Sequence, residues 1–213
     1  MKVLGIVCSP RKGGNTEILV KEALTRAKDC GAETELLTVW DKEIKPCDGC
    51  AFCADTGKCH IEDDMQEIYL KFLDTDGIIW GTPVYFSDVT AQAKIIIDRL
   101  YALYKIGRLA NKVAGVISVA GGVGHASVWN LFTAFFAENH MFSVDLVYGF
   151  ASKKGDILKD KHAMKSAWEL GRQVVLTVER QFRFPEEYDI PMYRYVEREY
   201  GISSSPTKGR FNE

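Results

Sequence analysis

Short apolar runs alternate with amphipathic segments along most of the chain, and this alternation restricts the fold more than any other feature. Strand-like runs cover residues 2–8, 33–40, 77–81, 113–120 and 143–150. Strands that are connected by helices pair in parallel, and the helices cover both faces of the sheet. The sequence therefore predicts an α/β, doubly wound, five-stranded parallel sheet in the order 2-1-3-4-5, with ligands bound at the carboxyl ends of the strands.

The segments expected to form helices cover 15–29, 63–74, 90–104, 124–140 and 161–180. Helix 90–104 differs from the others because it is apolar nearly all round, with Ile95 and Tyr101 outside its main apolar stripe. A helix of this kind is buried on both sides. We therefore expect it to form the contact of a homodimer or homotetramer, and the alternative is that the chain's own tail covers it.

Residues 1–180 are expected to form one domain that contains the cysteine-rich loop 47–59. Residues 181–213 then form an extension, which is too rich in aromatic residues for a simply disordered end and should pack on the domain or on a partner subunit.

The formal net charge of −2 excludes the basic excess that nucleic-acid and anionic-membrane binders carry. No apolar run approaches the roughly 18 residues of a membrane span. The chain leads directly into its first strand, without the features of a signal peptide, so we expect a cytoplasmic protein.

The first strand runs into a loop, Ser9-Pro10-Arg11-Lys12-Gly13-Gly14-Asn15-Thr16, and then into a helix. Such a turn points free backbone N–H groups and the positive end of a helix at one place, where a phosphate fits. The loop matches neither the dinucleotide fingerprint nor the P-loop. The alternative is a plain turn followed by an N-cap. The residues expected to bind phosphate are Ser9, Arg11, Gly14, Asn15 and Thr16.

Two further loops are expected at the same edge of the sheet. Pro83, Val84, Tyr85 and Phe86 follow the third strand, and Tyr85 or Phe86 can lie against a planar ring. The loop after the fourth strand lets a flat ligand approach the backbone, and its candidate residues are Ala120, Gly121, Gly122 and Gly124. A phosphate loop beside two ring-suited loops favours a mononucleotide such as FMN. The alternative for Tyr85 and Phe86 is packing in the core or in an interface.

Four of the six cysteines lie close together, with the spacing C-x2-C-x2-C-x5-C: Cys47, Cys50, Cys53 and Cys59. Thiols that cluster in a cytoplasmic chain indicate metal or redox chemistry more often than disulfides. Four thiolates are the usual ligands of a [4Fe–4S] cluster, and the first three steps match a ferredoxin run. Zinc, or a loop without metal, remains an alternative. Cys8 and Cys30 are expected to be small buried hydrophobic residues.

These motifs resemble the iron–sulfur flavoprotein branch of the NADPH-dependent FMN reductase, flavodoxin-like superfamily. The resemblance rests on Ser9–Thr16, on Cys47–Cys59 followed by Asp63-Asp64-Met65, and on Gly81–Tyr85, and it covers about residues 1–150. It implies noncovalent FMN, a [4Fe–4S] cluster and homodimers or homotetramers. It also implies that Ser9, Arg11, Asn15 and Thr16 hold the phosphate. The residues that would line the isoalloxazine are Pro83, Val84, Tyr85, Phe86, Gly121, Gly122 and Gly124.

The expected function is that of an FMN- and [4Fe–4S]-containing oxidoreductase. It would pass electrons between a one-electron donor such as ferredoxin and an acceptor, since FMN accepts one or two electrons. No residue is expected to act as a catalytic acid, base or nucleophile. Three alternatives stay open: an NAD(P)H-dependent FMN or quinone reductase with a structural cysteine loop, a non-enzymatic flavodoxin-like electron carrier, and a zinc-stapled interaction protein.

Overall fold

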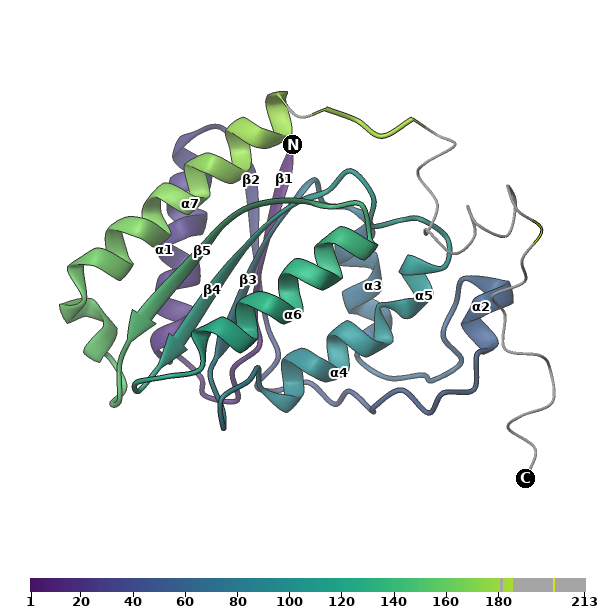
Figure 1. Cartoon of the computed structure of the whole chain (residues 1–213), viewed down its shortest axis with the longest axis horizontal. Helices are drawn as coiled ribbons and strands as arrows, with labels where there is room; N and C mark the ends of the chain where they lie inside the picture. The colour runs from purple at the N-terminus through teal and green to yellow at the C-terminus, as the bar shows by residue number, and fades with distance from the viewer. Residues whose placement is uncertain (181, 186–200, 202–213) are drawn as a thin grey trace.

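Five parallel strands form the centre of the molecule, in the order β2-β1-β3-β4-β5 (Figure 1). The computed structural model describes residues 1–180, 182–185 and 201. The strands are β1 (Lys2–Val7), β2 (Glu33–Thr38), β3 (Gly77–Pro83), β4 (Val113–Ala120) and β5 (Phe142–Phe150). The predicted strand order and fold class are confirmed. The expectation for residues 181–213 falls mostly outside the described residues.

Helices cover both faces of this sheet, as Figure 1 shows. One face packs against α1 (Asn15–Asp29) and α7 (Lys161–Arg180). The other face packs against α3 (Met65–Leu73), α4 (Ala91–Arg99), α5 (Tyr101–Tyr104) and α6 (His125–Glu138). None of the described helices combines the length and the apolar character needed to cross a bilayer.

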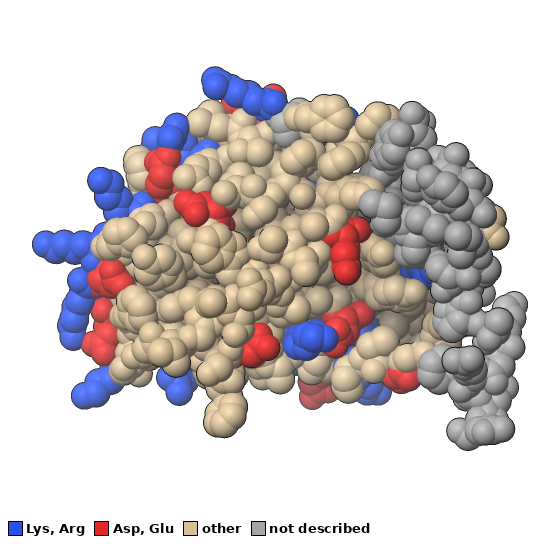
Figure 2. Space-filling model, viewed as in Figure 1, with Lys and Arg blue, Asp and Glu red and all other residues tan. Residues whose placement is uncertain are grey.

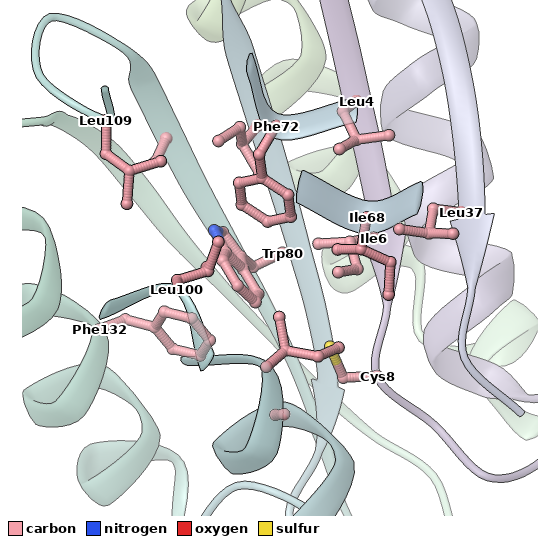
Figure 3. Packing of buried hydrophobic residues seen from close by; sticks show 14 of the residues in the cluster. Leu4, Ile6, Cys8, Leu37, Ile68, Phe72, Trp80, Leu100, Leu109 and Phe132 are labelled. Carbon is pink, nitrogen blue, oxygen red and sulfur yellow. The ribbon is translucent and has the colours of Figure 1, made fainter. Parts of the chain in front are cut away.

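The core under α3, α4 and α6 is organised around Trp80, whose side chain is fully buried (Figure 3). The rings of Phe72 and Phe132 lie 5.4 and 5.1 Å from the Trp80 ring, centre to centre, in tilted arrangements. Trp80 belongs to β3, a strand that is buried from Gly77 to Thr82 and therefore reads as a continuous apolar run. These ring contacts fix α3 and α6 on the sheet.

The segment 90–104 is divided into two helices and is not the single helix that we expected. Thr90 caps α4 by accepting a hydrogen bond from the Ala93 N–H, and the helix ends at Arg99 before α5 begins at Tyr101. One face of the segment is buried in the chain's own core, and Tyr101 is 39% exposed. Two short helices were not predicted, α2 (Phe52–Thr56) and the 3-10 helix η1 (Asp156–Lys159), since neither is long enough to show a periodic pattern.

Helix α3 offers a matched test of this core, because Ile68 is fully buried and Leu70 is 67% exposed. We expect Ile68→Ala to lower the free energy of unfolding by about 2–5 kcal/mol, through lost burial and a residual cavity. Leu70→Ala should change it by less than about 0.5 kcal/mol. Urea denaturation of FMN-saturated protein measures both values. Equal losses in the two variants would contradict the packing described for α3.

Candidate functional site

A cavity of about 320 Å³ opens at the carboxyl edge of the sheet. The loops after β1, β3 and β4 converge on it, as the parallel topology requires. The predicted residues that line it are Ser9, Arg11, Gly14, Asn15, Thr16, Pro83, Val84, Tyr85 and Gly121. Four other residues complete the lining: Val119, Ala151, Ser152 and Lys154.

The β1–α1 loop presents the start of α1 to this cavity. Gly14 occupies the N-cap position and has no side chain with which to cap the helix. Within the described chain, the N–H groups of Asn15, Thr16 and Glu17 have no hydrogen-bond partner. These free donors and the positive end of the helix dipole favour an anion at this point. The exposed Arg11 and Lys154 add positive charge at the same end of the cavity.

Glu17 stabilises the turn that precedes α1. Its Oε2 accepts a hydrogen bond of 2.7 Å from the Gly13 N–H, and Gly13 has a φ of 62°. Burial by itself raises the pKa of Glu17, but hydrogen bonds from Lys21 and Gly13 outweigh it and hold the pKa below its ordinary value. The carboxylate therefore stays charged and holds the glycine turn in its left-handed conformation.

Asn15 connects two loops that are far apart in the sequence. Its Nδ2 donates to the Lys153 carbonyl at 2.9 Å, and its Oδ1 accepts from the Gly155 N–H at 2.8 Å. We had expected this side chain to offer its amide to a phosphate, whereas in the structure both of its polar groups bind the loop after β5. This contact helps to bring Ala151, Ser152 and Lys154 to the cavity. Sequence analysis missed these residues, although they directly follow the carboxyl end of β5, which was itself predicted.

The ring-suited loops are held together by close backbone contacts. Gly124 has a φ of 101°, and a Cβ atom there would lie 2.5 Å from Val84 and 2.9 Å from the Ser87 Cα, so only glycine fits. Tyr85 and Asp88 exchange backbone hydrogen bonds of 2.9 and 3.2 Å, which closes a tight turn. Phe86 stands at the tip of this turn with its side chain fully exposed. Phe86, Ala120, Gly122 and Gly124 do not line the cavity, in contrast to Tyr85 and Gly121.

His125 follows the glycine loop at the first position of α6, and sequence analysis did not select it. Its Nδ1 lies 2.6 Å from the Oγ of Ser118, which is fully buried. Its Nε2 is buried without a hydrogen-bond partner among the described residues, and its ring lies 5.6 Å from the Tyr148 ring and 5.1 Å from the Phe150 ring, centre to centre. Burial lowers the pKa of His125, because it disfavours the charged imidazolium. Its position directly after Gly124 is the only sequence signal that points to it.

The four clustered cysteines lie in a loop with little regular structure. Cys47 and Cys50 are exposed, and Cys53 and Cys59 are half-buried. Burial, followed by the charges of the other three thiols, raises the pKa of Cys53 to about 11. Cys53 therefore lies within electrostatic range of the other three thiols. Cys8 is fully buried at the end of β1 and Cys30 is partly buried at the end of α1, so both lie apart from this loop.

No three of the four thiols lie within 4.8 Å of one another among the described side chains, so they are further apart than the ligands of one zinc ion. Four thiolates on one zinc ion lie about 3.8 Å from each other, as Zn–S bonds of about 2.3 Å require. Among the described side chains, the only three potential ligands within 4.8 Å of one another are Asp48, Cys50 and His60. A four-iron cluster accepts thiolates that are further apart, because each binds a different iron.

Asp48 organises the exposed part of the loop. Its Oδ1 accepts a hydrogen bond from the Cys50 N–H at 3.1 Å, and its Oδ2 lies 2.7 Å from Nε2 of His60. Hydrogen bonds from Cys50, followed by the one from His60, lower the pKa of Asp48 to about 2. His60 is thus occupied by Asp48, and we do not assign it as a ligand.

The fold and the cavity together define a flavodoxin-like protein that binds a mononucleotide at the switch point of a doubly wound sheet. The family model described as NADPH-dependent FMN reductase matches residues 1–155. An iron-sulfur flavoprotein of Methanocaldococcus jannaschii is 40% identical over 189 residues, which cover 84% of this chain and 97% of that protein. An iron-sulfur flavoprotein of Archaeoglobus fulgidus is 31% identical and covers 92% of this chain and 89% of its own.

Solved structures agree at the level of the fold. RosB, solved with 8-demethyl-8-formylriboflavin-5'-phosphate bound, superimposes with a TM-score of 0.69 at 19% identity, over 84% of this chain and 79% of that one. An archaeal flavodoxin superimposes with a TM-score of 0.56 at 10% identity, over 84% of this chain and all of its own.

The family model and the two iron-sulfur flavoproteins show that the chain belongs to the NADPH-dependent FMN reductase family, in its iron-sulfur flavoprotein branch. It is an FMN-dependent oxidoreductase.

The Asn15 contacts predict a measurable effect on FMN affinity. Asn15→Ala removes two hydrogen bonds that fix the loop after β5 at the cavity, so FMN binding should weaken about tenfold, or about 1.4 kcal/mol. Thr25→Ala serves as the control, since Thr25 lies on the same helix outside the cavity lining and its hydroxyl donates to the Lys21 carbonyl. Titration of the FMN-free protein by flavin fluorescence measures both affinities. Unchanged affinity in Asn15→Ala would contradict the role of this cross-link.

His125 predicts a defined pH dependence of stability. Its folded pKa lies below the unfolded value, so the unfolded state binds more protons, and stability falls as the pH drops below about 6.5. His125→Asn keeps a polar group near Ser118 and cannot titrate. The wild type should therefore lose more stability than the variant between pH 7 and pH 5.5, as measured by urea midpoints at both values. Parallel pH profiles would contradict this assignment.

Proposed function

We propose that this oxidoreductase carries a [4Fe–4S] cluster in addition to FMN. It would pass electrons between a one-electron donor such as ferredoxin and an acceptor, by way of the flavin. The observation that carries the proposal is a four-thiol loop, Cys47–Cys59, within the same domain as the FMN cavity. FMN suits this function because it joins one-electron carriers to two-electron substrates.

The FMN phosphate would be held by the start of α1. Ser9, Arg11, Gly14, Asn15 and Thr16 line that end of the cavity, and the free N–H groups of the first helical turn supply donors for phosphate oxygens. The residues assigned to the isoalloxazine are Pro83, Val84, Tyr85 and Gly121. Phe86, Ala120, Gly122 and Gly124 would shape these loops, and Gly124 does so through its contact with Val84.

The cluster would be held by Cys47, Cys50, Cys53 and Cys59. Two observations support this ligand set: the spacing of the cysteines, and the separation of their thiols, no three of which lie within 4.8 Å of one another as a single zinc ion would require. The names of the relatives in Methanocaldococcus jannaschii and Archaeoglobus fulgidus agree with it. A cluster of this type supplies single electrons at a potential that the surrounding hydrogen bonds and charges set.

The chain would act as a homodimer or homotetramer. Tyr101 and Ile97 of the segment 90–104 remain partly exposed. Beside them, α6 presents exposed residues without a charge until Glu138, among them Trp129, which is 55% exposed. Figure 2 shows the corresponding broad uncharged area on this face of the molecule. An uncharged area of this kind favours contact with a second copy.

The second candidate is an NADPH-dependent FMN reductase in which the cysteine loop is structural, and the description of the family model favours it. The two functions differ in the electron donor. Rapid anaerobic bleaching of the flavin by NADPH would favour this second candidate, whereas reduction by ferredoxin with little effect of NADPH would favour the first.

Metal analysis of anaerobically purified protein tests the cluster directly. We expect about four iron and four sulfide ions for one FMN per chain. Cys53→Ala should lose most of the iron and sulfide and retain its FMN. Cys30→Ala, which alters a thiol outside the loop, should match the wild type. One FMN per chain without iron or sulfide would exclude the cluster and leave the flavin reductase.

A further inference from the structure

Arg99 is the largest fully buried charged residue of the described chain, and the FMN cavity does not include it. It is the last residue of α4, its side chain is 0% exposed, and it pairs with Asp63, whose side chain is 5% exposed. Both carboxylate oxygens take part, because Nη1 of Arg99 lies 2.8 Å from Oδ2 and Nη2 lies 3.1 Å from Oδ1. This is the two-pronged geometry that a guanidinium provides and an ammonium does not.

The pair fastens both ends of the cysteine loop. Ahead of the cysteines, the Lys45 carbonyl accepts from Arg99 Nη1 at 2.7 Å, and the Lys45 N–H donates to Asp63 Oδ2 at 2.9 Å. Behind them, the Ile61 carbonyl accepts from Arg99 Nη2 at 3.2 Å, and Asp63 Oδ1 accepts from the Met65 N–H at 3.0 Å. Both ends of the segment 46–60 are therefore held at one buried ion pair.

Asp64 strengthens this closure. Its Oδ2 accepts from the Glu43 N–H at 2.7 Å, and its own N–H donates to the Glu43 carbonyl at 3.3 Å. The hydroxyl of the buried Tyr69 donates to the Arg99 carbonyl at 2.8 Å, and Tyr69 and Cys59 line the same surface hollow. The support thus extends from α4 to the last cysteine of the loop.

Global stability alone does not account for this arrangement. A buried ion pair loses so much hydration that apolar residues of similar volume often stabilise a protein equally well. The hydrogen bonds of this pair are directed instead at the backbone on either side of one loop. They hold a segment that has only a single short helix, α2, of its own.

We propose that the Arg99–Asp63 pair is the positioning element of the cysteine loop. It closes the loop at its base, so that the four thiols are held near one another before a cluster is bound. The pair acts through the loop backbone and is not itself a ligand. The consequence for cluster uptake rests on the function proposed above, whereas the order of the loop does not.

Hydrogen exchange on FMN-loaded, iron-free full-length chain tests the order of the loop. Arg99→Lys keeps the charge but loses the two-pronged contact. The double variant Arg99→Met with Asp63→Leu removes both charges. It leaves no unpaired buried charge, so it should destabilise the fold less than removal of either partner alone. Lys94→Gln is the control, because Lys94 lies on the same helix and forms an exposed pair with Asp98.

We expect the amides of residues 46–62 to exchange at least tenfold faster in Arg99→Lys and in the double variant, with strand exchange and FMN content unchanged. Lys94→Gln should match the wild type. After anaerobic reconstitution, both variants should retain less than half of the wild-type iron and sulfide. If the amides of residues 46–62 exchanged at the wild-type rate in the double variant, the proposal would be overturned.

The two proposals fail in different ways. Wild-type protein that takes up no iron would reject the cluster, and the exchange of residues 46–62 would still decide the role of Arg99. If residues 46–62 exchanged faster in the variants but iron retention stayed normal, the pair would order the loop without a part in cluster uptake.

Discussion

All five strands run in the same direction, and this single constraint places the functional part of the molecule. Because the sheet is parallel, the loops after β1, β3, β4 and β5 emerge at one edge, whatever their distance in the sequence. At the same edge α1 begins with three backbone N–H groups that have no hydrogen-bond partner among the described residues. Helix starts leave such donors in any fold, but here the sheet aligns them with the other loops. The position of the candidate anion site is thus a consequence of topology.

This dependence explains which parts of the cavity could be predicted. The strand order follows from local patterns of apolar residues and was predicted correctly, and the loops after β1, β3 and β4 converge on the cavity as that order requires. The contribution of Ala151–Lys154 was missed, because it depends on hydrogen bonds between Asn15 and a loop 138 residues away. Phe86 is an aromatic residue of the kind that lies against a planar ring. In the structure, Phe86 and Ser87 are two consecutive residues in the left-handed conformation, and the Phe86 side chain points into solvent.

The cysteine loop shows a different limit of sequence analysis. The four thiols can be identified from their spacing alone, because the cysteines lie close together in the sequence. The residues that hold the loop at its base cannot be identified in this way. In the sequence, Arg99 is one polar residue near the end of an apolar helix, and Asp63 is one of several charged residues after the cysteines. Only the folded chain shows that the two form a buried ion pair at the base of the loop.

Helix α4 connects the two sites physically. At its start, the hydroxyl of Thr90 donates to the Cys8 carbonyl at 2.6 Å, and the Thr90 N–H donates to Thr82 Oγ1, at the carboxyl ends of β1 and β3. At its end, Arg99 holds the cysteine loop. A helix of nine residues spans about 14 Å. Because both ends are fixed by buried hydrogen bonds, α4 sets the separation between the FMN edge of the sheet and the base of the cysteine loop.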